Sequence, residues 1–198
     1  MFWFTITLIW PFFTIFFPTK VIGRKNLVKG KAIWACNHQS NWDIWVIGTR
    51  IYKKFYTLGK QELFKSKIVG AFLKSIGTIP VNRGKADIQA VKSCLRVLKD
   101  KQKPLVIFPT GTRTSSPDEV QNLKNGVSMF ATKSDAKIVP IVLVRKPKFL
   151  RTNRMVIGEA IDPKDYNSYE EINKELTHRM EEMLEKYSYK SKKNKEKK

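Results

Sequence analysis

The chain has 198 residues, of which 42% are hydrophobic and 12% aromatic, and it carries a formal net charge of +21 at pH 7. This length accommodates one domain with a substantial core rather than two full domains, and the apolar content excludes a largely disordered chain. So large a positive charge needs an anionic partner, which narrows the candidates to nucleic acid, an anionic membrane surface, or phosphorylated and acidic substrates.

The N-terminal segment is strongly apolar. Residues 1–18, MFWFTITLIWPFFTIFFP, carry no charged side chain, and the first basic residue is Lys20. This run is shorter than the roughly 20 apolar residues of a spanning helix, and Pro11 interrupts it. Its large aromatic side chains suit the headgroup region of a bilayer. The sequence therefore predicts that residues 1–25 form a hydrophobic helical membrane anchor lying in one leaflet, in preference to a spanning helix or a buried core helix.

Short apolar runs alternate with helical patterns along residues 26–188, which we predict to form one folded domain. Strands are predicted at residues 32–36, 56–58, 78–81, 105–108, 138–144 and 155–157, and helices at residues 67–75, 87–99, 123–133 and 170–187. Pro80 cannot donate to a central ladder, so the strand that contains it is expected at an edge. The alternation predicts an α/β fold with a central mixed, mostly parallel sheet flanked by helices.

Two further features of the chain concern its surface and core. In the helix at residues 87–99, the side chains of Ile88, Val91, Leu95 and Leu98 are spaced to form one buried face. Residues 189–198 contain the run KSKKNKEKK, which predicts a basic disordered tail. Adhesion of this tail to anionic lipid is the alternative.

One short segment carries an acid–base pair. His38 and Asp43 are separated by four residues in the run NHQSNWD, at the point where a strand ends and a helix is expected to begin. A histidine oriented and charge-stabilised by a carboxylate is a general base near neutral pH. Taken alone, a surface histidine beside a helix-capping aspartate explains the same spacing equally well.

Two other segments place an arginine just beyond a strand. The run GTIPVNR ends in Arg83, and the run FPTGTRT contains Gly111 and Arg113. An arginine forms a bidentate fork on a phosphate, and a glycine allows the backbone to approach an anion closely. Taken singly, either arginine is better explained by a surface ion pair.

Together, these motifs and the later run VPI occur in an order that resembles the glycerolipid acyltransferase family, which includes 1-acyl-sn-glycerol-3-phosphate (lysophosphatidic acid) acyltransferases. The resemblance extends over about residues 30–144 and implies that residues 26–188 form an acyltransferase domain. It implies transfer of a fatty acyl group from an acyl carrier protein or coenzyme A thioester to the 2-hydroxyl of lysophosphatidic acid. It implies no cofactor, and no metal-ligand cluster stands in the sequence. The expected location is the cytoplasmic face of the cell membrane, with the anionic membrane surface as a partner.

The resemblance also implies roles for particular residues. His38 would deprotonate the acceptor hydroxyl, Asp43 would hold the histidine tautomer, and backbone amides near this turn would stabilise the oxyanion. The acceptor phosphate would be bound by three basic residues, Lys60, Arg83 and Arg113. The acceptor loop would be formed by Thr110, Gly111 and Thr112. Lys124 and Gly126 resemble a further family motif, although a helix start explains them equally well.

Thr110 departs from the family pattern, which usually has a glutamate there. The substitution places the identity of the acceptor in question and leaves two alternatives: an enzyme for another lysophospholipid or for glycerol phosphate, or a catalytically lapsed lipid-binding homologue. Nucleic-acid binding rests on charge alone, because no recognition motif accompanies it and the apolar N-terminus argues against it. Cys36 and Cys94 fit neither a disulfide framework nor a metal site and are expected to be small buried residues.

Overall fold

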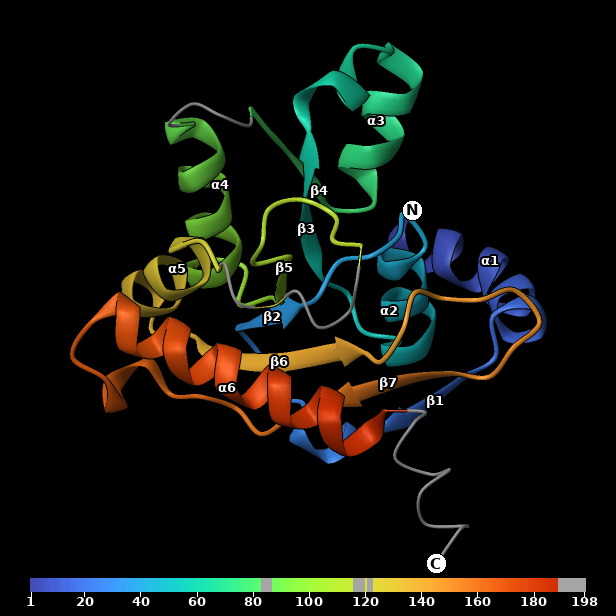
Figure 1. Ribbon diagram of the computed structural model, residues 1–198. Helices are drawn as coiled ribbons and strands as arrows, with labels where there is room; N and C mark the ends of the chain where they lie inside the picture. The colour runs from blue at the N-terminus through green and yellow to red at the C-terminus, as the bar shows by residue number, and fades with distance from the viewer. Residues whose placement is uncertain (83–86, 116–119, 121–122, 189–198) are drawn as a thin grey trace, which may run out of the picture.

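The computed structural model describes residues 1–82, 87–115, 120 and 123–188. Its centre is a seven-stranded sheet with the strand order β1-β7-β6-β2-β5-β3-β4 (Figure 1). The strands are β1 (Thr19–Ile22), β2 (Ala32–Cys36), β3 (Tyr56–Lys60), β4 (Thr78–Val81), β5 (Leu105–Ile107), β6 (Lys137–Leu143) and β7 (Asn153–Ile157). All neighbouring pairs of these strands are parallel except β6 with β7, so the prediction of a mixed, mostly parallel sheet is confirmed.

The two edges of the sheet differ in how well the sequence predicted them. β4 lies at one edge, as Pro80 indicated. β1 lies at the other edge and pairs with β7, with Thr19 opposite Asn153. This strand was not predicted, because it has four residues, includes the exposed Lys20, and lacks a fully buried side chain. Since β1 falls within residues 1–25, that segment contributes a strand to the sheet as well as a helix.

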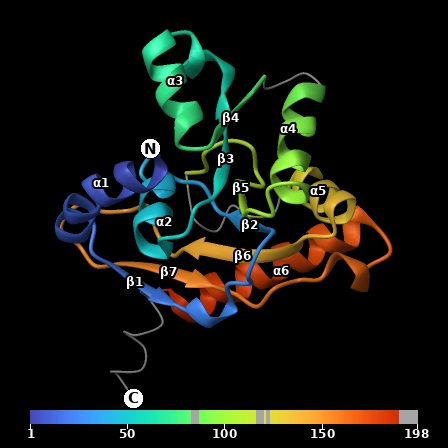
Figure 2. The same cartoon turned by 180° about the vertical axis from the view of Figure 1, so that it is seen from behind.

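Helices cover both faces of the sheet (Figures 1 and 2). They are α1 (Phe2–Phe16), α2 (Asp43–Ile51), α3 (Lys67–Ser75), α4 (Ile88–Lys99), α5 (Gly126–Ser134) and α6 (Tyr169–Tyr187). Successive side chains of β2 point to opposite faces: Ile33 and Ala35 join a core with α4, α5 and α6, whereas Trp34 and Cys36 join a second core with α1 and α2. The segment that contains His38 and Asp43 thus follows a central strand that is buried on both faces.

The buried face of α4 differs from the predicted one. Ile88 is 65% exposed, and the buried residues are Ala90, Cys94, Val97 and Leu98. The helix begins at Ile88, after an N-cap in which Asp87 Oδ1 accepts a hydrogen bond from the amide of Ala90 at 2.9 Å. The prediction for Ile88 was wrong because this first helical residue lies outside the contact with the sheet, whereas the small Ala90 and Cys94 side chains allow close approach.

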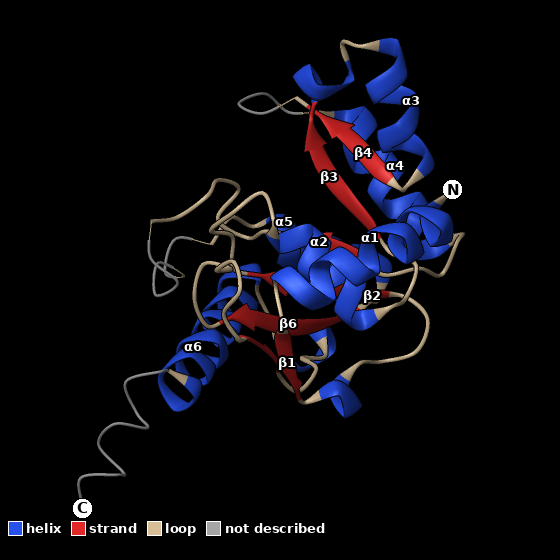
Figure 3. Ribbon diagram, turned by 90° about the vertical axis from the view of Figure 1, so that its right-hand side faces the viewer, coloured by secondary structure: helices blue, strands red, loops and turns tan. Residues whose placement is uncertain are grey.

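Helix α1 lies with α2 on one side of the sheet, as the side view in Figure 3 shows. Its inner face buries Phe2, Ile6 and Phe13. Its outer face is apolar and between 42% and 67% exposed at Trp3, Phe4, Leu8, Trp10, Phe12 and Ile15. The helix is therefore half-buried, and its outer face carries no charged side chain. Within the described part of the chain, no helix combines the length and apolar character needed to cross a bilayer.

Candidate active site

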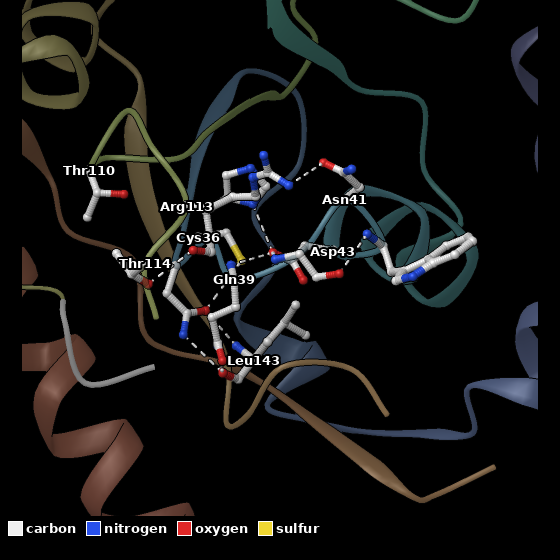
Figure 4. A network of polar contacts seen from close by, with 12 residues as sticks. Cys36, Gln39, Asn41, Asp43, Thr110, Arg113, Thr114 and Leu143 are labelled. Atoms are coloured by element: carbon white, nitrogen blue, oxygen red, sulfur yellow. Dashed lines mark hydrogen bonds and ion pairs between the residues drawn. The ribbon is translucent and has the colours of Figure 1, made fainter. Parts of the chain in front are cut away.

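The turn between β2 and α2 is fastened to the end of a neighbouring strand. Asn37 Nδ2 donates to the Leu143 carbonyl oxygen at 3.0 Å, and the Leu143 amide donates to Asn37 Oδ1 at 2.8 Å. Gln39 Nε2 donates to the same carbonyl at 3.0 Å (Figure 4). Asn37 and Gln39 are both buried. The residue between them, His38, is therefore held by two buried side-chain contacts at the carboxyl end of the central strand.

His38 and Asp43 meet as the spacing predicted. His38 Nδ1 lies 2.9 Å from Asp43 Oδ2, and the side chains are 14% and 0% exposed, respectively. The same carboxylate oxygen accepts the backbone amides of Gln39 at 2.7 Å and Ser40 at 2.8 Å. With Nδ1 as the donor to Asp43, Nε2 is the nitrogen with a lone pair for a substrate proton. The amides of Gln39 and Ser40 are therefore already paired with Asp43 and are not available to an oxyanion.

The loop after β5 holds His38 from its other side. The imidazole stacks on the Phe108 ring, with ring centroids 3.9 Å apart and planes inclined by 18°. The His38 carbonyl oxygen accepts hydrogen bonds from Thr114, from its amide at 2.8 Å and its hydroxyl at 3.0 Å. Neither role was predicted, because a single aromatic residue at the end of a strand and a loop threonine carry no distinctive sequence signal.

A cavity of about 760 Å³ opens beside His38, within the size range of small-molecule pockets. Its polar lining comprises His38, Asn41, Lys60, Thr112 and Arg113, with Thr5, Thr57 and Thr78 elsewhere on the wall. Its apolar lining comprises Phe2, Ile6, Ile44, Trp45, Phe55, Leu58, Leu63, Leu73, Ile76 and Phe108. The cavity therefore joins the imidazole of His38, two cationic side chains and a long apolar wall.

Two of the three predicted phosphate-binding residues lie in this cavity. Lys60 is the last residue of β3 and is exposed, and Arg113 extends from the loop after β5. Arg113 Nη1 lies 3.4 Å from Asn41 Oδ1 (Figure 4). Lys60 and Arg113 are 53 positions apart in the sequence, and the adjacent parallel strands β3 and β5 bring them to the same wall. Arg83 lies outside the described residues.

The predicted acceptor loop is a tight turn. Gly111 has a φ of 72°, which favours glycine, and the Thr110 hydroxyl donates to the Thr112 carbonyl at 2.8 Å. Thr112 faces the cavity, whereas the Thr110 hydroxyl is used within the turn. The Lys124 ammonium packs over Gly111, 3.0 Å from the position a β-carbon would take there. Gly126 begins α5, so the helix-start interpretation of that motif is confirmed.

Cys36 precedes the turn that holds His38 but is a poor nucleophile. It is fully buried at the end of β2. Burial, with a smaller contribution from the negative charge of Asp43, raises the pKa of its thiol well above the usual value. A thiolate is therefore strongly disfavoured here. Among the described residues, no three His, Cys, Asp or Glu side chains are grouped closely enough to hold a metal ion.

Comparison with known proteins places the chain among acyltransferases. The family model described as Acyltransferase matches residues 18–144. The 1-acyl-sn-glycerol-3-phosphate acyltransferase of Bacillus subtilis is 31% identical over 158 residues, which are 74% of this chain and 75% of that protein. The Helicobacter pylori protein of the same name is 30% identical, over 74% of this chain and 67% of its own length.

The fold has a counterpart among solved structures. The crystal structure of a 1-acyl-sn-glycerophosphate acyltransferase from Thermotoga maritima superposes with a TM-score of 0.72 at 23% identity. The superposition covers 93% of this chain and 78% of that one. At this identity the likeness concerns the fold, and it includes the mixed sheet with helices on both faces.

Proposed function

The chain belongs to the acyltransferase family, and from that premise we propose that it transfers a fatty acyl group from an acyl thioester to the 2-hydroxyl of lysophosphatidic acid, giving phosphatidic acid. The observation that carries this proposal is the composition of one cavity. Its lining combines His38, paired with the buried Asp43, with two cations and an apolar wall. Lysophosphatidic acid carries a hydroxyl, a phosphate and an acyl chain. In this cavity the hydroxyl is matched by His38, the phosphate by the two cations, and the acyl chain by the apolar wall.

The proposed reaction is direct attack without an acyl-enzyme. His38 Nε2 takes the proton of the 2-hydroxyl as its oxygen bonds to the thioester carbonyl carbon. The tetrahedral intermediate then collapses, the carbon–sulfur bond breaks, and the imidazolium returns the proton to the departing thiolate. Asp43, bonded to Nδ1 at 2.9 Å, stabilises the imidazolium in between. General-base assistance of this kind contributes about 10²- to 10⁴-fold in rate.

Substrate binding is divided between the two kinds of lining. Lys60 and Arg113 bind the acceptor phosphate, with Arg113 suited to a bidentate contact. The apolar side chains bind acyl chain, which gains about 0.8 kcal/mol for each methylene removed from water. The donor is coenzyme A or acyl carrier protein thioester, and both are acidic, so the net charge of +21 attracts either.

We place the enzyme on the cytoplasmic face of the cell membrane, with α1 lying in the bilayer interface. Six large apolar side chains on the outer face of α1 are at least 42% exposed. A patch of this kind on one helix is characteristic of membrane or protein contact. The acceptor is itself a membrane lipid, so this location brings the cavity to its substrate.

The test is acyl transfer in anionic vesicles by the purified protein. Labelled acyl-coenzyme A and acyl carrier protein thioester are each offered with lysophosphatidic acid, another lysophospholipid, or glycerol phosphate. Wild type is compared with His38→Ala and Asp43→Asn, all shown to be folded by circular dichroism. We expect phosphatidic acid from wild type, and a rate lower by about 10²-fold or more from either variant.

Other outcomes distinguish the alternatives. Product from a different acceptor alone would reassign the substrate and keep the mechanism. Lipid binding by wild type without product from any acceptor and donor would identify a lapsed homologue, which the Thr110 substitution allows. Unchanged turnover in His38→Ala would refute the general-base mechanism.

A further inference from the structure

The loop between β6 and β7, residues 144–152, presents two large apolar side chains to solvent. Phe149 is 54% exposed and Leu150 is 62% exposed. The sequence around them, VRKPKFLRT, contains four basic residues and no acidic one, and Lys146, Lys148 and Arg151 are exposed. An apolar tip between basic side chains is unfavourable in water and is complementary to an anionic lipid surface.

This loop is held firmly in its exposed form. The Lys148 amide donates to Asn153 Oδ1 at 2.9 Å, and Asn153 Nδ2 donates back to the Lys148 carbonyl at 3.2 Å. Asn153 itself is buried and its amide donates to the Pro18 carbonyl at 2.7 Å. The loop is thus tied to the residues that lead from α1 into β1.

Leu150 takes a backbone conformation that leucine normally avoids. Its φ is 52°, in the left-handed region where Gly and Asn are favoured. Its amide donates to the Phe16 carbonyl at 2.7 Å, which satisfies a group at the end of α1. Folding therefore holds a large apolar side chain outward at a position where a small polar residue would be less strained, which points to a role for that side chain outside the core.

The loop tip reaches the exposed face of α1 through Phe16, whose ring centroid lies 4.8 Å from that of the exposed Phe12. The Phe149 ring stacks on Phe16 with centroids 4.9 Å apart and lies edge-on to Phe17 at 5.8 Å. Phe17 in turn contacts Trp42 at 5.4 Å, and Trp42 is the residue before Asp43. Figures 1 and 2 show the loop running beside the end of α1. The aromatic contacts thus extend from the loop tip to the start of α2.

We propose that residues 144–152 are a second membrane-contact element, in which Phe149 and Leu150 insert into an anionic leaflet beside α1 while Lys146, Lys148 and Arg151 bind lipid headgroups. The inference rests on the proposed membrane location of α1 and adds to it a specific loop. A protein held by one helix in the interface can rotate about the axis of that helix. A second contact, from a different part of the chain, fixes the orientation of the protein on the bilayer. A second copy of the chain fits this surface poorly, because a two-fold contact would bring two basic loops together.

Binding to vesicles of phosphatidylglycerol and phosphatidylcholine, measured by co-sedimentation, tests the loop directly. The variant is Leu150→Asn, since Asn accepts the positive φ and removes only the apolar group. We expect its thermal midpoint to equal or exceed that of wild type and its vesicle affinity to fall by about tenfold. Ile88→Asn is the matched control, because Ile88 is 65% exposed on α4, far from α1 in Figure 1, and we expect wild-type binding.

The charges and the helix supply two more variants. Replacing Lys148 and Arg151 by Gln lowers affinity for anionic vesicles by about fivefold for each charge, and leaves binding to pure phosphatidylcholine unchanged. Leu8→Asn tests whether α1 itself binds the membrane, because Leu8 is 67% exposed on the outer face of that helix. Weak binding by Leu8→Asn with wild-type binding by Leu150→Asn overturns the loop proposal and keeps α1 as the anchor. Wild-type binding by both overturns both proposals, independently of whether acyl transfer is observed.

Sedimentation velocity separates lipid from protein as the occupant of this surface. If wild type is a dimer that Leu150→Asn converts to a monomer without changing vesicle binding, the loop is a protein interface and the proposal is overturned. If Leu150→Asn weakens vesicle binding and leaves the sedimentation coefficient unchanged, the loop contacts lipid.

Discussion

Asn37 and Leu143 form two hydrogen bonds, at 3.0 and 2.8 Å. In both, the side-chain amide of Asn37 pairs with the Leu143 backbone as a neighbouring strand would. The pairing of β2 with β6 runs as far as Cys36 opposite Ile141. The Asn37 side chain thus continues the connection between these strands beyond the ladder, at the residue immediately before His38. The backbone can turn away from the sheet here without leaving the Leu143 amide and carbonyl unpaired.

Replacing Asn37 by Ala should impair both stability and turnover. The substitution removes the partner of the buried Leu143 amide, which lowers the free energy of unfolding by roughly 1–3 kcal/mol. We also expect kcat to fall by at least about tenfold, because an imidazole misplaced by a fraction of an ångström transfers protons poorly. Urea denaturation and steady-state kinetics measure the two effects. The exposed Asn167→Ala is the control, and wild-type kcat in Asn37→Ala would contradict the positioning role.

Replacing Lys60 or Arg113 by Ala should weaken acceptor binding more than it slows chemistry. Both side chains line the cavity, and a hydrogen bond to a charged group is worth roughly 1.5–3 kcal/mol. We expect the KM for lysophosphatidic acid to rise about 10- to 100-fold while the KM for the acyl donor changes little. Arg113→Lys should recover only part of the loss, because lysine lacks the bidentate fork. Equal effects on an acceptor without a phosphate would contradict this assignment.

Changing Leu73 should alter acyl-chain preference. Leu73 is half-buried on α3 and lines the apolar part of the cavity. Leu73→Trp reduces the space, so chains longer than the wild-type optimum should lose kcat/KM by about fourfold for each methylene that no longer fits. Leu73→Ala should shift the preference toward longer chains. A series of acyl-coenzyme A substrates measures the profile. If the preferred length is the same in all three proteins, this part of the cavity does not hold acyl chain.

The two thiols should be inert in the native protein. Burial raises the pKa of the Cys94 thiol to about 12 and raises the pKa of the Cys36 thiol well above its usual value. We expect neither to react with a disulfide reagent at pH 8 until the protein is unfolded, and activity to persist throughout. The unfolded Cys94 thiol ionises near pH 9.0, whereas the folded one keeps its proton to about pH 12. Its contribution to the free energy of unfolding therefore falls as pH rises across that window. Rapid labelling of Cys36 with loss of turnover would instead favour a thiol nucleophile.

Much of the architecture could be inferred from local patterns. Buried strands of a parallel sheet appear as short apolar runs, and helices as runs with a period near 3.6, so β2, β5, β6 and α6 were predicted to within a few residues. The pairing of His38 with Asp43 was likewise predictable, because four intervening residues form a single turn. The edge position of β4 followed from Pro80 alone.

The contacts that complete the site depend on chain segments far apart in sequence. Asn37 with Leu143, His38 with Phe108, and the presence of α1 in the cavity wall have no local signature, since each depends on which strands become neighbours in the sheet. The strand β1 was missed because its stability comes from its pairing with β7, not from its own composition. Local sequence sets the elements and the spacing of His38 and Asp43, whereas tertiary packing decides what surrounds this pair, because burial and hydrogen-bond partners are properties of the assembled sheet.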